Sequence, residues 1–226
     1  MRPIRIALTK GRLEDGTAAL FRRAGIDCSA LEHKGRRLIL PLDGGRAEAV
    51  LAKAPDVVTY VEHGVCDLGV VGKDIILEHG GTFYEVLDLG FGKCRFALAA
   101  PKGRDFFSGY SAKTVATKYP NVTRGYFEKK AMDVRIIRIE GSVELAPLLG
   151  LSDAIVDLVE TGTTLRENGL AVIEDVCGVS ARLIVNAASM KLRKIEIEEF
   201  AGRLERAGRA DPGEKSRATA ERTEKQ

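Results

Sequence analysis

An apolar run of strand length in this chain leads directly into a polar, glycine-containing loop, and this junction narrows the folds that the sequence can adopt. The run from Ala154 to Val159 is apolar except for Asp157, and the residues from Glu160 to Thr164 follow it without a break. A run of this composition predicts a strand that is covered on both faces, as in α/β proteins. Because the loop opens a helix, its backbone amides and hydroxyls can face outward together. The segment therefore predicts an anion-binding loop.

A sugar phosphate fits this loop better than a bare phosphate does. The first amides of a helix lack intrahelical acceptors, the helix dipole is positive at that end, and Gly162 lets the backbone approach a ligand closely. The loop threonines add hydroxyl donors, whereas Asp157 and Glu160 disfavour an anion unless sugar hydroxyls donate to them. An ordinary strand-to-helix turn with Thr163 as its N-cap remains an equal alternative from this segment alone.

Composition excludes several other classes of protein. The 226 residues suffice for one large or two small domains, and a hydrophobic content of 45% with a net charge of +3 gives no indication of a nucleic-acid surface. No apolar run reaches membrane-spanning length, and Met1 to Leu8 lacks a signal-peptide core, so a cytoplasmic protein is expected. Three histidines and four widely spaced cysteines predict no bound transition metal; the cysteines are Cys28, Cys66, Cys94 and Cys177.

Two further polar segments follow predicted strands in the first part of the chain. A strand around Ile4 to Leu8 leads through Lys10, Gly11 and Arg12 into a helix, and a buried strand at Asp67 to Val71 leads into Gly72, Lys73 and Asp74. Both segments are predicted at the carboxyl edge of a sheet, where open α/β folds bind ligands. Solvated loop charges are the alternative for each basic residue.

The order of predicted strands and helices indicates two α/β lobes. The first lobe is predicted to comprise residues 1–92 plus 173–207, and the second residues 93–172, which include the anion-binding loop. A double crossover near residues 92 and 172 would leave a cleft between the lobes. Residues 208–226 are polar and poor in large apolar side chains, which predicts a disordered tail.

Several phrases closely resemble those of the ATP phosphoribosyltransferase family, in the family's order and as far as about Met190. They are KGR (10–12), TYVEHG (59–64), GKD (72–74), ATKYPN (116–121), GSVELAPLLGLSDAIVDLVETGTTLRENGL (141–170) and SARLIVN (180–186). The longest phrase resembles the family's phosphoribosyl-diphosphate loop. This resemblance is more specific than any single glycine-rich loop.

The resemblance implies a fold and a reaction. The fold is that of type II periplasmic binding proteins, with two α/β lobes and a central cleft, and not the usual phosphoribosyltransferase fold. In the reaction, N1 of the adenine of ATP attacks the anomeric carbon of 5-phosphoribosyl 1-diphosphate, which gives phosphoribosyl-ATP and diphosphate in the first step of histidine biosynthesis. Mg²⁺ is expected to arrive on the substrate diphosphate with few protein ligands.

The chemistry of this reaction predicts roles for individual residues, of which Arg36 and Arg95 lie outside the matched phrases. Arg12 and Arg36 are predicted to stabilise the leaving diphosphate, since guanidinium groups match phosphate oxygens and stay charged. A surface ion pair remains open for Arg36, because Arg37 is adjacent and could exchange roles with it. The predicted phosphoribosyl-diphosphate ligands are Asp157, Glu160, Thr161, Gly162, Thr163 and Thr164. The predicted ATP or diphosphate ligands are Lys10, Gly11, Gly72, Lys73, Asp74 and Arg95.

The family's long members carry a C-terminal regulatory domain that binds histidine, whereas only a helix and a polar tail are predicted here beyond Met190. The chain therefore resembles the short form, a catalytic subunit that assembles with a regulatory partner related to histidyl-tRNA synthetase. Two alternatives remain. One is a non-enzymatic two-lobed module that senses or carries a small anion, and the other is a different glycosyl-transferring enzyme that uses the same sugar donor.

Overall fold

A computed structural model describes residues 2–109 and 111–209, and the chain divides into two compact α/β units. Unit 1 comprises residues 1–72, 81–91 and 181–226, and unit 2 comprises residues 73–80 and 92–180. The chain therefore changes unit after Gly72, Gly80, Phe91 and Ser180. The sequence predicted only two such crossings, near residues 92 and 172.

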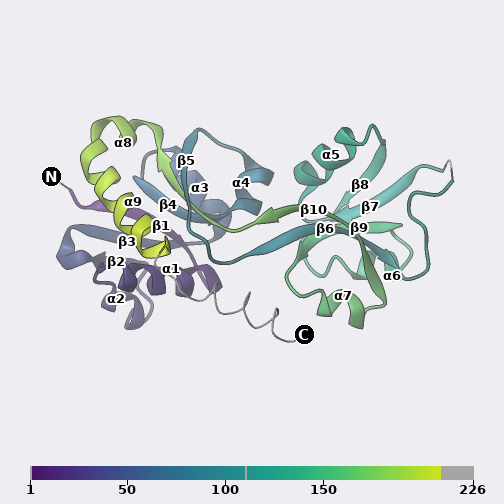
Figure 1. The fold of residues 1–226 in the computed structure, drawn as a ribbon, viewed down its shortest axis with the longest axis horizontal. Helices are drawn as coiled ribbons and strands as arrows, with labels where there is room; N and C mark the ends of the chain where they lie inside the picture. The colour runs from purple at the N-terminus through teal and green to yellow at the C-terminus, as the bar shows by residue number, and fades with distance from the viewer. Residues whose placement is uncertain (1, 110, 210–226) are drawn as a thin grey trace, which may run out of the picture. The chain divides into compact units, whose positions relative to one another are not determined.

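Unit 1 is a six-stranded sheet in the order β2-β3-β1-β4-β11-β5, covered by helices (Figure 1). Strand β1 pairs in parallel with β3 and β4, whereas β2, β11 and β5 run antiparallel to their neighbours. Its elements are β1 (Ile4–Thr9), α1 (Arg12–Arg23), α2 (Ser29–Glu32), β2 (Ile39–Leu42), the 3-10 turn η1 (Asp43–Gly45), β3 (Ala47–Ala52), α3 (Ala54–Glu62), β4 (Leu68–Gly72), β5 (Phe83–Asp88), β11 (Ala181–Asn186), α8 (Ala187–Leu192) and α9 (Lys194–Arg209).

The two faces of this sheet are covered by different helices. Ile6 and Leu8 of β1 are buried in one core with apolar residues of α1 and α9, where the rings of Phe21 and Phe200 meet edge to face at 5.8 Å. Helix α3 packs closely on another face, because a Cβ added at Gly69 of β4 would lie 2.7 Å from Val61. Glycine is therefore required there for close helix-to-sheet packing.

Unit 2 is a five-stranded sheet in the order β10-β6-β9-β7-β8 (Figure 1). Strand β7 is parallel to β8 and β9, and β6 is antiparallel to β9 and β10. Its elements are α4 (Lys73–His79), β6 (Cys94–Pro101), β7 (Lys113–Thr117), α5 (Pro120–Lys129), β8 (Val134–Arg138), α6 (Leu145–Leu148), β9 (Ala154–Val159), α7 (Thr163–Glu167) and β10 (Leu170–Val179).

The apolar run from Ala154 to Val159 forms the central strand β9, which is buried on both faces. Ala154 and Val156 belong to one apolar cluster of unit 2, and Ile155 and Val159 belong to a second. Since side chains alternate along a strand, the two clusters lie on opposite faces of the sheet. The predicted doubly covered strand is confirmed.

Three features differ from the sequence prediction. Strand β10 pairs with β6 from Leu170 to Val179, so it lies in unit 2, whereas the sequence analysis assigned residues 173–207 to the first lobe. Strand β5, for which the sequence analysis gave no strand, is a half-exposed edge strand. Helix α8 was not predicted, although its N-cap is clear: the Asn186 side chain accepts hydrogen bonds from the amides of Ala188 and Ser189. The predicted tail lies outside the described residues beyond Arg209.

Helix α4 follows β4 of unit 1 in the chain but packs in unit 2, where Glu78 caps helix α5. Its carboxylate accepts hydrogen bonds from the amides of Asn121 (2.9 Å) and Val122 (3.1 Å), and the Asn121 side chain donates to the Glu78 carbonyl at 2.8 Å. Glu78 is buried, and its carboxylate accepts hydrogen bonds from first-turn amides that would otherwise lack a partner.

We expect Glu78→Ala to lower the free energy of unfolding by about 1–3 kcal/mol, because two part-buried amides lose a charged acceptor. Urea unfolding followed by circular dichroism measures this loss. Glu128→Ala, at an exposed position of α5, serves as the matched control and should change stability by less than about 0.5 kcal/mol. Equal stabilities for the two variants would contradict the capping role.

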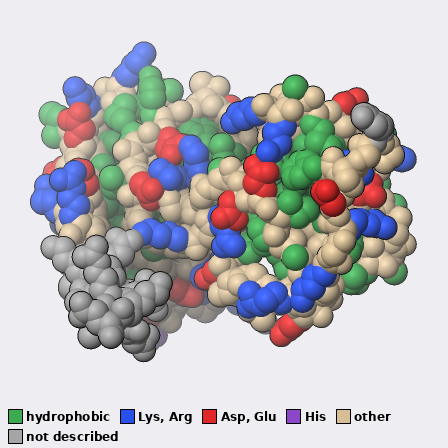
Figure 2. Space-filling model, turned by 45° about the vertical axis from the view of Figure 1, so that its right-hand side comes forward, with side chains coloured by type: hydrophobic (Ala, Val, Ile, Leu, Met, Phe, Trp, Pro, Cys, Tyr) green, Lys and Arg blue, Asp and Glu red, His purple; other side chains and the backbone are tan. Residues whose placement is uncertain are grey.

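Charges of both signs are mixed on one face of the molecule. Lysine and arginine side chains alternate with aspartate and glutamate over the face shown in Figure 2. This mixture matches the small net charge of +3.

Candidate functional site

The predicted phosphoribosyl-diphosphate residues come together in unit 2, around the end of strand β9. The chain leaves β9 at Val159 and turns at Gly162, whose φ of 72° is left-handed, before α7 begins at Thr163. These residues surround a pocket of about 230 Å³. It is lined by Glu144, Asp157, Leu158, Val159, Glu160, Thr161, Gly162, Thr163, Thr164 and Leu165.

The hydroxyls and amides of this loop provide its donors. The hydroxyls of Thr161 and Thr163 lie 3.1 Å apart, and the amides of Thr161 and Gly162 donate no hydrogen bond within the described residues. Helix α7 has only five residues, so the predicted dipole contribution is small. The loop is suited to an anion mainly through these local donors.

Three carboxylates, those of Asp157, Glu160 and Glu144, also line the pocket. Burial raises the pKa of Asp157 to about 6, the Leu158 amide opposes this by donating to it at 2.8 Å, and the nearby Glu144 charge raises it further. Sequence reasoning missed Glu144. Its only signal was its place in the longest matched phrase, since no local pattern predicts that the start of α6 reaches the end of β9.

The raised pKa of Asp157 predicts a pH-dependent cost in stability. The folded state holds the Asp157 proton more tightly than the unfolded state, so stability should fall as pH rises between about 4 and 6 and stay lower above that range. Asp157→Asn keeps the acceptor for Leu158 without titrating. We expect it to be more stable than the wild type by about 1–2 kcal/mol at pH 8, and by much less at pH 5. Urea unfolding at the two pH values measures this difference, and a gain that does not change with pH would mean that titration of Asp157 is not its cause.

Arg95 of β6 also reaches the loop. Its Nε donates to Asp175 Oδ1 at 2.6 Å, and its Nη1 lies 3.5 Å from the carbonyl oxygen of Glu160. Arg95 is thus placed beside the loop backbone, with its strongest hydrogen bond to a carboxylate of the neighbouring strand β10.

The basic KGR phrase lies at the junction between β1 and α1 in unit 1. The Lys10 amide donates to Ala52 at the end of β3, Gly11 is the N-cap of α1 with a φ of 87°, and Arg12 is the first helical residue. The junction therefore follows the carboxyl end of a parallel strand, as the sequence predicted.

Arg36 lies in the loop between α2 and β2, which is held against α1. Lys34 of that loop forms an ion pair with Glu14, in the first turn of α1 after Arg12. The Arg37 guanidinium donates to the carbonyls of His33 and Lys34 in its own loop. Arg36 is exposed and has no hydrogen bond or ion pair within the described residues. Of the two arginines, Arg36 is therefore the one whose guanidinium is available to a ligand.

The GKD phrase is divided between the two units, because Gly72 ends β4 and α4 begins at Lys73. The Lys73 amide donates to the Ser180 carbonyl, and Asp74 accepts a hydrogen bond from the Tyr119 hydroxyl at 3.4 Å. Burial raises the pKa of Asp74. Asp74 thus already has a partner within unit 2 and does not line the pocket at Gly162.

The described residues contain neither a metal-binding group of side chains nor a helix that could span a membrane. Within residues 2–109 and 111–209, no three or more His, Cys, Asp or Glu side chains are grouped so that they could hold a metal ion. No helix over the same residues combines the length and apolar character needed to cross a bilayer.

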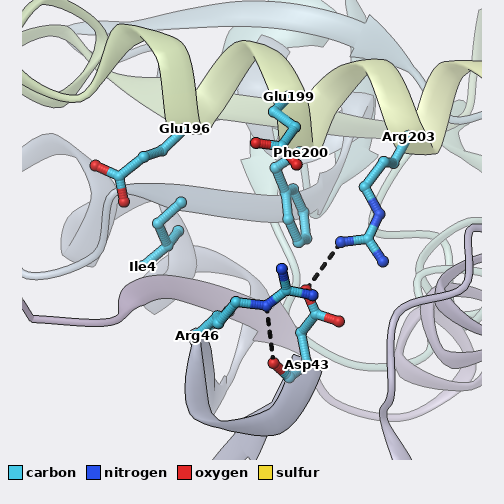
Figure 3. Close-up of a pocket in the computed structure, with 8 residues that line it drawn as sticks. Ile4, Asp43, Arg46, Glu196, Glu199, Phe200 and Arg203 are labelled. Atoms are coloured by element: carbon cyan, nitrogen blue, oxygen red, sulfur yellow. Dashed lines mark hydrogen bonds and ion pairs between the residues drawn. The ribbon is translucent and has the colours of Figure 1, made fainter.

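A second pocket, in unit 1, is built from charges that neutralise one another (Figure 3). Asp43 accepts from Arg203 of α9 at 2.8 Å and pairs with Arg46 at 2.8 Å, and Arg203 holds the pKa of this carboxyl below its usual range. Arg203 also donates to the carbonyl of Gly25 at 2.7 Å. These contacts fasten α9 to the turn between β2 and β3, so the pocket has a structural explanation.

Comparison with known proteins connects this site to a family. The family model described as ATP phosphoribosyltransferase matches residues 53–206. Curated ATP phosphoribosyltransferases from Clostridium kluyveri and Clostridium acetobutylicum are 60% identical over 204 residues and 58% identical over 197 residues. These matches cover 90% and 87% of this chain, and 93% and 92% of those proteins.

Solved structures agree with this comparison. A chain of the ATP phosphoribosyl transferase (HisG:HisZ) complex from Thermotoga maritima has a TM-score of 0.77 and 33% identity, over 92% of this chain and 100% of that chain. The periplasmic aliphatic sulphonate binding protein SsuA from Escherichia coli, at 10% identity, has a TM-score of 0.57 over 97% of this chain and 77% of that chain, which shows a likeness of fold alone. The predicted fold class, that of periplasmic binding proteins, is confirmed. Because the family model covers most of the chain and the Clostridium kluyveri protein matches 90% of it at 60% identity, this protein belongs to the ATP phosphoribosyltransferase family.

Proposed function

We propose that this protein joins ATP to 5-phosphoribosyl 1-diphosphate in the first step of histidine biosynthesis. Adenine N1 carries a lone pair and no proton, so it attacks the anomeric carbon without a side-chain base. The bond from N1 to that carbon forms as the bond from the carbon to the diphosphate oxygen breaks, and the electron pair leaves with diphosphate. The products are N1-(5-phosphoribosyl)-ATP and diphosphate.

The observation that carries this proposal is the pocket around Gly162. The threonine hydroxyls suit the 5′-phosphate of the sugar donor, and so do the amides of Thr161 and Gly162, which donate no hydrogen bond to any described residue. Asp157 and Glu160 line the same pocket and can accept hydrogen bonds from the ribose hydroxyls. A phosphate alone would meet only repulsion from these acids, whereas a phosphorylated ribose satisfies both kinds of group.

The leaving diphosphate gains negative charge as the sugar becomes oxocarbenium-like, so fixed cations should supply much of the catalysis. We assign this role to Arg12 and Arg36, with Lys10 and the Gly11 backbone assisting in binding. The start of α1 supports the assignment, since a helix of 12 residues favours an anion at its N-terminus. Mg²⁺ bound to the diphosphate would neutralise part of the same charge.

The remaining ATP or diphosphate candidates, Gly72, Lys73, Asp74 and Arg95, stay predictions. Arg95 contacts the phosphate loop, which supports a role close to the sugar donor. Asp74 accepts a hydrogen bond from Tyr119, which supports a structural role in unit 2 more than a role in binding.

The proposed assembly is a cytoplasmic hetero-oligomer with a regulatory subunit related to histidyl-tRNA synthetase. A solved relative from Thermotoga maritima forms a HisG:HisZ complex and covers 92% of this chain. Light scattering of the two purified proteins, mixed and apart, tests the assembly. A mixture in which each protein keeps its separate mass would contradict it.

The activity test mixes the protein with ATP, phosphoribosyl diphosphate and Mg²⁺, with and without that regulatory subunit. The expected result is an ultraviolet absorbance change from the adduct, with one phosphoribosyl-ATP formed for each diphosphate released. Calorimetric binding of phosphoribosyl diphosphate without an adduct under either condition would instead favour the anion-sensing alternative.

A further inference from the structure

The phosphate pocket has an unusual charge balance. Its lining contains three carboxylates and no lysine or arginine, although the proposed ligand is an anion. Arg166 and Arg95 contact carbonyls of the loop, and the charge of Lys118 acts on Asp157 from outside the pocket, but none of these three cations is part of the lining. The pocket therefore needs its amide and hydroxyl donors held firmly in place, because no side-chain cation lines it.

Arg166 of α7 holds the loop in place through two hydrogen bonds from one guanidinium group. Its Nη1 donates to the carbonyl of Thr161 at 3.0 Å, and its Nη2 donates to the hydroxyl oxygen of Thr163 at 3.0 Å. The same guanidinium lies close to the turn between them, since a Cβ added at Gly162 would be 3.4 Å from Nη1. One planar group thus fixes the residues on both sides of the left-handed glycine.

This contact also sets the direction of an amide. In a trans peptide the carbonyl and the following N–H point in opposite directions, and no described peptide is cis. With the Thr161 carbonyl held by Arg166, the Gly162 amide must point away from the guanidinium. The longer contact from Arg95 to the Glu160 carbonyl has the same consequence for the Thr161 amide. Neither of these two amides has an acceptor within the described residues.

We infer that Arg166 is a positioning residue for the phosphate loop, which orients the Gly162 amide and the Thr163 hydroxyl toward the 5′-phosphate of the sugar donor. This inference rests on the proposed function of the pocket. Arg166 acts on binding before the reaction begins and does not touch the departing diphosphate. The loss of Arg166 should therefore weaken capture of the sugar donor and leave the chemical step unchanged.

The test compares Arg166→Ala, Arg166→Lys and a control, Arg124→Ala, in the complete protein under assay conditions where the wild type is active. Arg124 is an exposed arginine of α5 that donates only to the Asn121 side chain among the described residues. For Arg166→Ala we expect the KM for phosphoribosyl diphosphate to rise about tenfold, with kcat within about twofold and the KM for ATP unchanged. Arg166→Lys should recover little of this loss, because an ammonium group lacks the planar fork that holds both oxygens. Arg124→Ala should behave as the wild type.

Two results would overturn the inference. One is an unchanged KM for phosphoribosyl diphosphate in Arg166→Ala, and the other is full recovery in Arg166→Lys, which would mean that charge alone matters. If Arg166→Ala folds poorly, Arg166→Gln replaces it, because glutamine keeps most of the side-chain length. An unchanged KM for phosphoribosyl diphosphate in Arg166→Gln would then overturn the inference. If the wild type makes no adduct, calorimetric binding of phosphoribosyl diphosphate to the same variants still tests Arg166, so the failure of the proposed function and of this inference remain distinguishable.

Discussion

Arg12→Ala is expected to lower kcat about 10²- to 10³-fold, while the KM for phosphoribosyl diphosphate changes much less. The effect falls on kcat because the negative charge on the diphosphate develops during the reaction. The diphosphate becomes more negative only as its bond to the sugar breaks, so a fixed guanidinium at the start of α1 gains most of its interaction energy in the transition state. Steady-state kinetics with each substrate varied in turn measures both parameters.

The matched control is Arg22→Ala on the same helix, where an exposed ion pair with Glu32 at 2.6 Å is lost. That pair should contribute little to stability and nothing to turnover. Arg12→Lys refines the test, because it keeps the charge but loses the fork, and we expect an intermediate kcat. A wild-type kcat in Arg12→Ala, or an increase in KM alone, would remove Arg12 from the catalytic group.

Gly162→Val is expected to weaken phosphoribosyl diphosphate binding by about 10²-fold and to leave ATP binding unchanged. Two effects act together. A β-branched residue is strained at a φ of 72°, and its side chain would occupy space beside the Arg166 guanidinium, which the Cβ already meets at 3.4 Å. Isothermal titration calorimetry with each substrate separates the two affinities.

Gly169 offers an unusually close control for the effect of strain. It follows α7, has a φ of 69°, and a Cβ there would meet no atom within 4 Å. Gly169→Val therefore carries similar backbone strain near the same helix but lies outside the pocket lining. Equal losses of sugar-donor affinity in the two variants would mean that strain in α7, and not obstruction of the pocket, causes the effect.

The strand and loop of the phosphate pocket could be predicted because their signals are local. The apolar run at Ala154–Val159 and the left-handed Gly162 both depend on residues that are adjacent in the chain. Glu144 and Arg166 could not be assigned in this way. The first comes from another element, and the second is one of many exposed arginines whose hydrogen bonds depend on the fold of the turn.

The misplaced strand β10 shows a different limit. Its pairing with β6 shifts register between Val172 and Glu174 and again between Asp175 and Cys177. Each irregularity inserts a residue and disturbs the inward and outward alternation on which pattern reading depends. The residue pattern therefore gave no information about which sheet this segment joins.

The capping of α5 by Glu78 has a practical consequence for dissecting the molecule. A fragment spanning only residues 92–180 would contain every strand of the second sheet and yet leave the amides of Asn121 and Val122 without their acceptor. Neither unit is a single stretch of chain, so neither can be recovered by one cut. The two halves of this enzyme must be studied by substitution within the intact chain or by rejoining its segments in a new order.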